Sequence, residues 1–167
     1  MAAHLYTTVD SPIGELLLVG DGHALQGLYM QAGRPKKIRP DWERSDEPFA
    51  AVAKQLAEYF AGERREFDVP LLLDGPPFQR QAWHALREIP YGETVSYGEQ
   101  ARRIGQPDAA RAVGAANGQN PIAVIVPCHR VIGADGSLTG FGGGLHRKRL
   151  LLDLEADAVS GAMRLQI

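Results

Sequence analysis

The chain has 167 residues, 44% of them hydrophobic and 23% charged, which fits one ordinary domain or two small ones and excludes wholesale disorder. Its single cysteine excludes an internal disulfide and a cysteine-cluster metal site, so we expect no metal. No apolar run approaches the roughly 18 residues of a membrane span, and the start lacks a secretory signal, so we expect a cytoplasmic protein. The net charge of −2 is uneven: residues 1–75 hold 8 basic and 12 acidic side chains, and residues 76–149 hold 9 and 5.

This asymmetry has two explanations. A basic second half is suited to a polyanionic partner, and 14 of the 18 cationic side chains are arginine, which forms bidentate contacts with phosphate. A genome that favours arginine codons would give the same composition. Composition alone leaves both explanations open.

The first part of the chain predicts a small antiparallel sheet followed by a helix. Short runs rich in Leu, Tyr, Thr and Val cover residues 4–9, 15–19 and 24–30, and turn residues separate them. We expect a loop over 31–47, a helix between Phe49 and Phe60 that ends at Gly62, and one more strand over 67–73. Two prolines and a glycine at 74–77 then mark a boundary. The predicted domains are therefore residues 1–75 and 76–167.

Beyond this boundary the apolar residues recur at helical spacing. A first helix is expected from Phe78 to Ile89. The Ser96-Tyr97-Gly98-Glu99 segment has the form of a capping box, and the helix that it opens should run to about Ile104 and stop at Gly105. Another helix should begin at Pro107 or Asp108 and run through Ala116. Two short helices joined by a tight turn predict a helix-turn-helix, and the whole chain therefore predicts an α+β protein.

The second of these two helices is almost free of large side chains. It contains mainly alanine and glycine, apart from Arg111 and Val113. Small residues allow a helix to pack closely against a neighbour, and they also make a helix slim enough for the minor groove of DNA, which is about 6 Å wide. In the second case Arg111 could occupy the space of a displaced base. The spacing does not choose between these interpretations.

Cys128 is the residue with the most chemical potential. A lone cysteine is by default a small buried hydrophobic residue. Here it follows a short apolar run over 121–126, interpreted as a buried strand, and it is flanked by Pro127, His129 and Arg130. Cationic neighbours favour the thiolate, which is the nucleophile. Adjacency in an extended segment does not place His129 against the sulfur, however.

The last segment contains a glycine-rich loop and an amphipathic helix. Gly142-Gly143-Gly144 matches no nucleotide-binding fingerprint. Residues 146–149 are basic and open the helix, either as a solvated face or as a phosphate contact, and Leu150, Leu151, Leu152 and Leu154 are expected on its core side. Glu155 is either a solvated carboxylate or the partner of a histidine.

Taken together, these motifs resemble one known family. Pro127-Cys128-His129-Arg130, preceded by Asn120-Pro121 and followed by Gly142-Gly143-Gly144, is similar to the methylated-DNA–protein-cysteine methyltransferase family, also called O6-alkylguanine-DNA alkyltransferases. The segments 91–98 and 109–114 fit the family in order and spacing, so the resemblance covers about residues 76–155. Residues 1–75 look like its variable ribonuclease-H-like domain of sheet and helix, and the second domain would be mostly helical and winged-helix-like.

The resemblance implies a role for each residue around the thiol. Cys128 would attack the alkyl carbon on O6 of a flipped guanine and keep the group as a thioether. His129 would draw the thiol proton through a water, Glu155 would orient that histidine, and Asn120 would hold the turns around the site. The family's reaction is stoichiometric and irreversible, needs no cofactor, and is expected to extend to O4-alkylthymine.

The resemblance also implies how the lesion is held. Tyr97 would contact the flipped guanine and its phosphate, and Arg111 would fill the vacated stack. The helix carrying Ala110, Ala112 and Gly114 would enter the minor groove, and the backbone at Cys128, Val131 and Gly142 would read the guanine edge. The expected partner is therefore double-stranded DNA containing O6-alkylguanine, bound by a monomer without any membrane.

Two other function classes use parts of the same pattern. Non-enzymatic proteins that bind alkyl lesions use the same scaffold but lack the acceptor cysteine, whereas Cys128 is present here. A cysteine hydrolase using Cys128 and His129 would turn over repeatedly instead of acting once.

Overall fold

The structure is a computed structural model, and it describes residues 4–32 and 35–161. The chain divides into two compact units, residues 1–73 with 121–123, and residues 74–120 with 124–167. The prediction placed the boundary between 75 and 76 and did not anticipate that residues 121–123 belong to the first unit. In the residues described, no helix is both long and apolar enough to cross a membrane.

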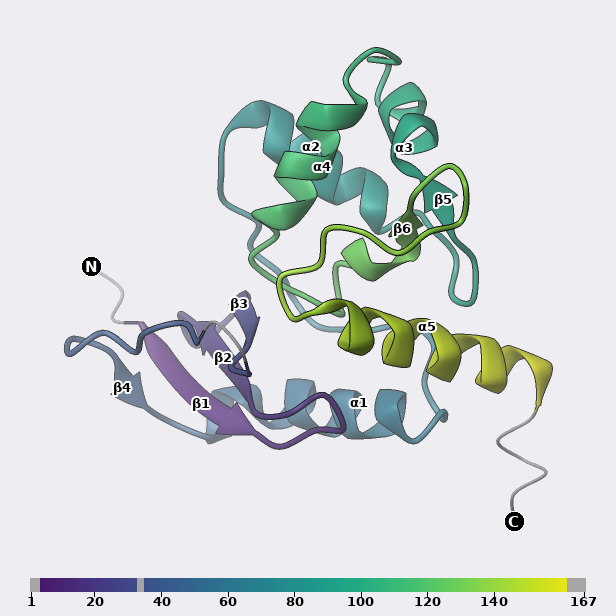
Figure 1. Cartoon of the computed structure of the whole chain (residues 1–167). Coiled ribbons are helices and arrows are strands. Elements are labelled where there is room, and N and C mark those ends of the chain that lie inside the picture. The colour runs from purple at the N-terminus through teal and green to yellow at the C-terminus, as the bar shows by residue number, and fades with distance from the viewer. Residues whose placement is uncertain (1–3, 33–34, 162–167) are drawn as a thin grey trace. The chain divides into compact units, whose positions relative to one another are not determined.

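The first unit is a mixed four-stranded sheet with one helix alongside (Figure 1). Its elements are β1 (Leu5–Val9), β2 (Leu16–Gly20), β3 (Leu25–Met30), β4 (Glu43–Arg44), the short 3₁₀ helix η1 (Glu47–Phe49) and α1 (Ala50–Phe60). The strand order is β3-β2-β1-β4, with β1, β2 and β3 antiparallel and β4 parallel to β1. All five residues of β2 are buried, which explains why its sequence is an unbroken apolar run.

The three long strands and α1 confirm the expectation for the first 60 residues, and two details differ. The segment predicted as a loop over 31–47 contains the two-residue strand β4. The strand expected over 67–73 is reduced to a bridge between Leu71 and Leu25, with backbone hydrogen bonds from Leu25 N–H to Pro70 and from Leu72 N–H to Leu25. A run bounded by Pro70 loses a ladder donor at that point, so the pairing stays short.

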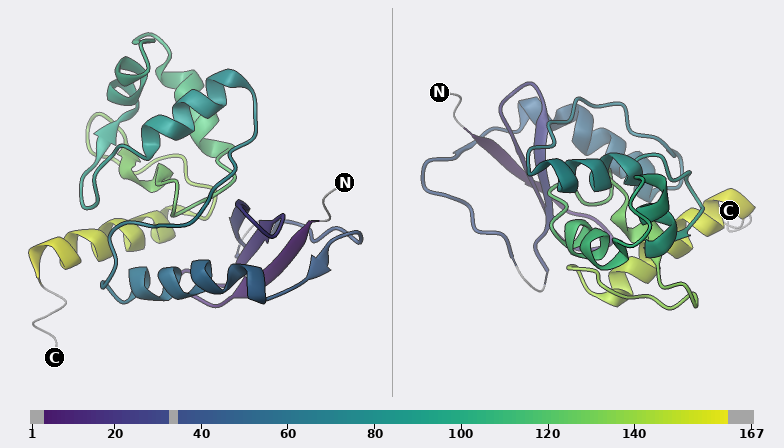
Figure 2. Two further views of the ribbon diagram at one scale, coloured as in Figure 1. Left: turned by 180° about the vertical axis from the view of Figure 1, so that it is seen from behind. Right: turned by 90° about the horizontal axis from the view of Figure 1, so that it is seen from above.

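The second unit contains a cluster of three short helices and one longer helix (Figure 2). Its elements are α2 (Pro77–Leu86), β5 (Val95–Ser96), α3 (Tyr97–Arg103), α4 (Ala110–Gly118), the 3₁₀ turn η2 (Cys128–Arg130), β6 (Val131–Ile132) and α5 (Leu145–Ser160). β5 and β6 pair in parallel. Together with the N-terminal sheet, these helices confirm the predicted α+β class.

Local chemistry explains the helix-turn-helix formed by α3 and α4. The Ser96 side chain accepts a hydrogen bond from the Glu99 backbone N–H at 3.0 Å, as the capping motif predicts. The Glu99 carboxylate lies 3.6 Å from Arg102 Nε. Gly105 has φ +77°, a left-handed conformation that ends α3. The following helix begins at Ala110, later than the expected Pro107 or Asp108, and runs on to Gly118.

A reciprocal pair of buried amides joins α3 to α4. Gln100 Nε2 donates to Asn117 Oδ1 at 2.9 Å, and Asn117 Nδ2 donates to Gln100 Oε1 at 2.8 Å. Trp83 of α2 donates its indole N–H to the Ala116 carbonyl at 2.8 Å. Each buried polar group in this contact has a partner, so the angle between the helices is fixed as well as their packing.

Candidate functional site around Cys128

Cys128 opens the turn η2 instead of ending a strand, so the expectation of a strand over 121–126 was wrong. Only the part around Ile122 forms a bridge, and Val124 has φ +70°, which turns the chain. Residues 122–127 are nevertheless all buried. A continuous apolar run indicates that the residues are buried, and a buried turn and a buried strand can have the same apolar sequence. Cys128 is partly exposed, and its N–H bonds to the Val126 carbonyl at 2.8 Å.

His129 is completely buried and bound on one side only. Its Nε2 lies 2.6 Å from Oε2 of Glu155 on α5. The other ring nitrogen, Nδ1, is buried and has no hydrogen-bond partner among the residues that the structure describes. An ionised carboxylate can only accept, so Nε2 carries the proton and Nδ1 carries the lone pair.

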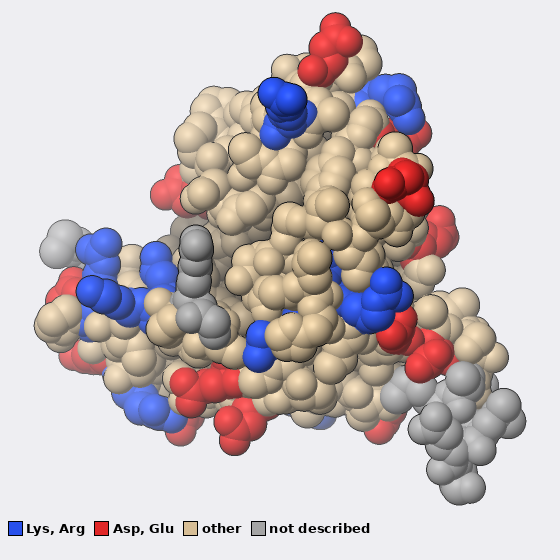
Figure 3. Space-filling view, in the orientation of Figure 1, with Lys and Arg blue, Asp and Glu red and all other residues tan. Residues whose placement is uncertain are grey.

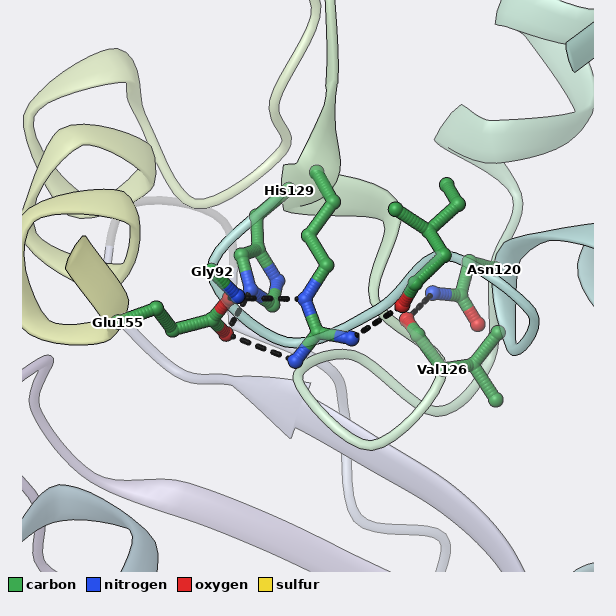
Figure 4. A network of polar contacts seen from close by, with 7 residues as sticks. Gly92, Asn120, Val126, His129 and Glu155 are labelled. Atoms are coloured by element: carbon green, nitrogen blue, oxygen red, sulfur yellow. Dashed lines mark hydrogen bonds and ion pairs between the residues drawn. The ribbon is translucent and has the colours of Figure 1, made fainter. Parts of the chain in front are cut away.

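Figure 4 shows His129 and Gly92 beside the Glu155 carboxylate, and Arg130 binds the same carboxylate. Its Nε lies 2.8 Å from Oε1 of Glu155 and its Nη2 lies 3.0 Å from Oε2. Nη1 donates to the Ile89 carbonyl at 2.7 Å. Oε1 of Glu155 also accepts the Gly92 backbone N–H at 3.2 Å. The carboxylate is thus surrounded by donors, as a buried charge requires.

These contacts set the ionisation of the pair. Burial by itself would raise the pKa of Glu155, but the hydrogen bonds and charges of His129 and Arg130 outweigh it and lower the pKa to about 2. Burial lowers the pKa of His129 below its usual value, and the charges of Arg130 and Lys148 act in the same direction, against Glu155. Near neutral pH the site therefore holds an anionic carboxylate and a neutral imidazole.

Asn120 contacts the turn that carries the thiol. Its Nδ2 donates to the Val126 carbonyl at 2.7 Å, two residues before Cys128, which fixes the turn that carries the sulfur. Burial raises the pKa of the Cys128 thiol, and a hydrogen bond from Asn120 and the charge of Lys148 only partly oppose this. The expectation that cationic neighbours would favour the thiolate was therefore wrong, because desolvation raises the pKa of Cys128 by more than these neighbours lower it.

Lys148 is part of the interior and not part of a solvated basic face. Its side chain is fully buried, and its Nζ donates to the carbonyls of Val131 at 2.6 Å and Thr139 at 2.7 Å. The buried face of α5 consists of Lys148, Leu151, Glu155 and Ala158. Consecutive residues of a helix point about 100° apart, so the four leucines expected on the core side cannot share a face, and among them only Leu151 is fully buried.

Tyr97 lies at the start of α3 beside the loop that Lys148 holds. Its hydroxyl donates to the Thr139 carbonyl at 3.1 Å and accepts from the Thr139 hydroxyl at 3.3 Å. A Cβ added at Gly114 would lie 3.6 Å from the Tyr97 ring. Tyr97 therefore lies between α4 and the Thr139 loop.

The two interpretations of α4 apply to different sides of the same helix. Val113 and Ala116 are buried and face the packing side, while Arg111 and Ala112 are exposed. Ala110 and Gly114 are intermediate. The small residues thus allow close packing on one side and leave a low, exposed surface on the other, with Arg111 as its long side chain.

The two remaining predicted positions differ in their surroundings. Val131 is buried, its N–H bonds to the Cys128 carbonyl, and its own carbonyl already accepts from Lys148. Gly142 is exposed, and a Cβ there would meet nothing within 4 Å. In the same loop, the Gly143 carbonyl accepts from Nη1 of Arg147 at 2.8 Å.

The structure therefore connects Cys128, His129, Asn120 and Glu155 through short turns and hydrogen bonds, and it leaves Arg111 outside that network. The sequence analysis treated Arg130 only as a cationic neighbour of the thiol and Lys148 only as part of a basic stretch, and it placed neither in the interior of the site. The positions 148, 151, 155 and 158 repeat with the period of one helix face, and this spacing was the available signal that Lys148 shares the side of Glu155.

Comparison with known proteins identifies the family of the chain. Residues 77–157 match the family described as 6-O-methylguanine DNA methyltransferase, DNA binding domain, and residues 4–73 match its ribonuclease-like domain. The chain belongs to the O6-methylguanine DNA methyltransferase family. This confirms the family suggested by the Pro127–Arg130 motif and the ribonuclease-like character of the N-terminal half.

Individual members of this methyltransferase family are similar over nearly the whole chain. A methylated-DNA–protein-cysteine methyltransferase of Mycolicibacterium paratuberculosis is 58% identical over 150 residues, 90% of this chain and 91% of that protein. One from Methanosarcina acetivorans is 53% identical over 151 residues, covering 90% and 97%. The crystal structure of Mycobacterium tuberculosis OGT in complex with DNA is similar with a TM-score of 0.87 and 56% identity, covering 92% of this chain and 94% of that one.

Proposed function

We propose that this protein repairs O6-alkylguanine in double-stranded DNA by transferring the alkyl group directly to Sγ of Cys128. The observation that carries the proposal is the buried His129–Glu155 pair, whose free Nδ1 belongs to the residue next to the thiol. Membership of the methyltransferase family and the DNA complex of a 56% identical structure support it.

The transfer needs a base because the resting thiol is protonated. Burial raises the pKa of Cys128, so only a small fraction is thiolate near neutral pH. Nδ1 of His129 accepts the thiol proton, directly or through one water, while Glu155 stabilises the resulting imidazolium. Sγ then bonds to the alkyl carbon, the bond from that carbon to O6 breaks, and its electron pair goes to the guanine. The guanine takes up one proton, so a thiol and an alkylguanine become a thioether and a guanine.

The lesion must leave the base stack to reach Cys128, because O6 lies inside the duplex. Flipping costs a few kcal/mol, and less for a badly paired base. The exposed side of α4 is low enough to lie in the minor groove, where Arg111 occupies the space of the flipped base. Tyr97 contacts the flipped guanine and its phosphate from the other side, and the backbone at Val131 and Gly142 reads its edge.

Figure 3 draws one face of the molecule, on which Lys and Arg side chains stand in separate groups among acidic ones. On that face there is no broad basic surface, and we place the specific contacts with DNA on α4 and the start of α3.

The thioether is stable, so each protein molecule acts once and is consumed. By the same chemistry, O4-alkylthymine is a second substrate. We infer that the protein acts in the cytoplasm as a monomer. Residues 76–167 bind DNA and accept the alkyl group, and residues 1–75 form a ribonuclease-H-like domain.

Mass spectrometry tests the proposal directly. After incubation with a duplex containing O6-methylguanine, we expect one added methyl group on the peptide that contains Cys128, at one equivalent per protein. Cys128→Ser should abolish the mass gain and keep DNA binding, and the sequence contains no other cysteine to take over. Repeated turnover would instead indicate a hydrolase, and binding without a mass gain would indicate a lesion-binding protein. Either result would overturn the proposal.

A further inference from the structure

The Arg130 side chain forms three hydrogen bonds at the site. Its guanidinium uses all three nitrogens, two on the Glu155 carboxylate and one on the Ile89 carbonyl. The residue is 7% exposed, and the ring of Tyr91 lies 5.5 Å from its central carbon. A side chain enclosed in this way has one available geometry.

We propose that Arg130 is a positioning residue for alkyl transfer, which holds both oxygens of Glu155 so that the lone pair of His129 stays on Nδ1. The inference rests on the function proposed above. Arg130 does not reach the thiol in any contact that the structure describes, and its effect passes through Glu155.

The first step of the argument concerns where an added proton would go. Oε2 of Glu155 already accepts from both Nε2 of His129 and Nη2 of Arg130. A proton taken up along the Nε2–Oε2 contact gives either an imidazolium, or a protonated carboxyl that donates to Nε2. Both arrangements leave a hydrogen on Nδ1, so both remove the base that Cys128 needs.

The second step concerns what prevents that proton from binding. The charged groups that act on His129 are Glu155 and Lys148 from α5, and Arg130 from its own turn. Glu155 favours the added proton, and the two cations oppose it. Arg130 is the cation hydrogen-bonded to the carboxylate, and opposite charges at this distance shift a pKa by about 1–3 units. Without Arg130 the pair would take up a proton at a higher pH.

The third step concerns geometry. A guanidinium presents parallel N–H groups that match the two oxygens of a carboxylate, whereas an ammonium is a point charge. The two parallel N–H groups of Arg130, its fork, therefore fix the plane of the Glu155 carboxylate. The direction of the contact between His129 Nε2 and Glu155 Oε2 is fixed with it. The third donor bonds to the Ile89 carbonyl, so the position of the fork is set by the segment that follows α2.

The experiment compares Arg130→Met and Arg130→Lys with the unmodified chain in two measurements. The first is an NMR titration of His129 in the free protein, which reports the tautomer and the protonation of Nδ1. The second is the pH profile of the single-turnover transfer rate. For Arg130→Met we expect the His129 titration and the acid limb of the rate to move up together by about one pH unit or more. Below that limb the rate should fall about tenfold per unit shift, and it should approach the unmodified rate at higher pH.

Arg130→Lys keeps the charge and loses the fork, so its titration should lie between those of the other two proteins. If Arg130→Met does not fold, an upward shift in Arg130→Lys supports the proposal and an unchanged titration overturns it. A rate that falls by one factor at every pH, with the His129 titration unmoved, also overturns it. The titration needs no substrate, so it decides the role of Arg130 even if the unmodified protein fails to gain a methyl group and the proposed function is lost.

Discussion

The two units differ in the kind of side chain that they bury. In the first unit the buried side chains are apolar, with Thr7 as the one polar residue among those the structure describes as buried. In the second unit a histidine, an arginine, a lysine and a glutamate are buried within one helix face and one turn. The first interior is stabilised by apolar area removed from water. The second is stable only while its charges are paired, because an isolated buried charge costs several kcal/mol.

The difference shows which interior carries chemistry. A leucine core can be exchanged for another apolar core of equal volume without losing a role. The charges around His129 have no such substitute, since their arrangement decides which ring nitrogen is basic. Each unit has its own reporter for this comparison, because the sequence has two tryptophans, Trp42 in the first unit and Trp83 in the second.

The largest effect is expected for Glu155→Ala. Removing the carboxylate leaves Arg130 buried without its counter-ion, and breaking one partner of a buried pair costs about 3–5 kcal/mol. Urea unfolding followed by Trp83 fluorescence measures this loss. Adding Arg130→Met to Glu155→Ala removes the unpaired charge, so the double variant should recover part of the free energy. A double variant that loses the sum of the two single losses would contradict the pairing argument.

The next effect, about 2–5 kcal/mol, is expected for Leu18→Ala in β2. Leu18 is fully buried among apolar neighbours, so the change removes apolar burial and leaves a cavity. Because no ionisable group is involved, the loss measured by Trp42 fluorescence should be the same at pH 8 and pH 3. The cost of Glu155→Ala should instead shrink as the pH falls from 4.5 toward 2, where the stabilisation from the lowered pKa of Glu155 is lost. A Leu18→Ala cost that followed pH would remove the distinction between the two interiors.

The pH dependence of the unmodified chain is the smallest effect when it is compared over one pH unit. The pKa of His129 is lowered in the folded state, so its contribution to stability is complete above its unfolded value of 6.5 and declines as the pH falls below it. Glu155, with its pKa lowered from 4.5 to about 2, adds a further loss as the pH falls from 4.5 toward 2. Each proton contributes at most about 1.4 kcal/mol per pH unit. Acid titration in fixed urea should therefore move the Trp83 signal before the Trp42 signal, and the reverse order would contradict the assignment.

The sequence predicted those elements whose pattern has a single structural meaning. The strands β1, β2 and β3, the cap at Ser96 and the stop at Gly105 were all readable, because alternation and capping chemistry act locally. The prediction of a strand over residues 121–126 was wrong, since a continuous apolar run indicates that residues are buried but does not indicate their backbone conformation. Val124 has φ +70°, a conformation that β-branched residues rarely adopt, so no local pattern predicts this turn.

The contact between His129 and Glu155 was expected from the family resemblance, and the structure contains it. The residue pattern alone left Glu155 open, because the two residues lie 26 positions apart. The same holds for Lys148, which looked like a surface cation next to other basic residues. Its burial depends on the carbonyls of Val131 and Thr139, and only the folded loop supplies those acceptors.

Residues 121–123 limit how the chain can be shortened, because they belong to the first unit although they lie within the sequence of the second. The Pro121 carbonyl and the Ala123 N–H bond to the backbone of Leu28 in β3. This short stretch comes from the later half of the sequence but belongs to the first unit. A fragment that begins at Pro76 or Pro77 would lack β3, so residues 121–123 would lose their backbone partners there. These residues lie only a few positions before Cys128. Miniaturisation would have to redesign that stretch first.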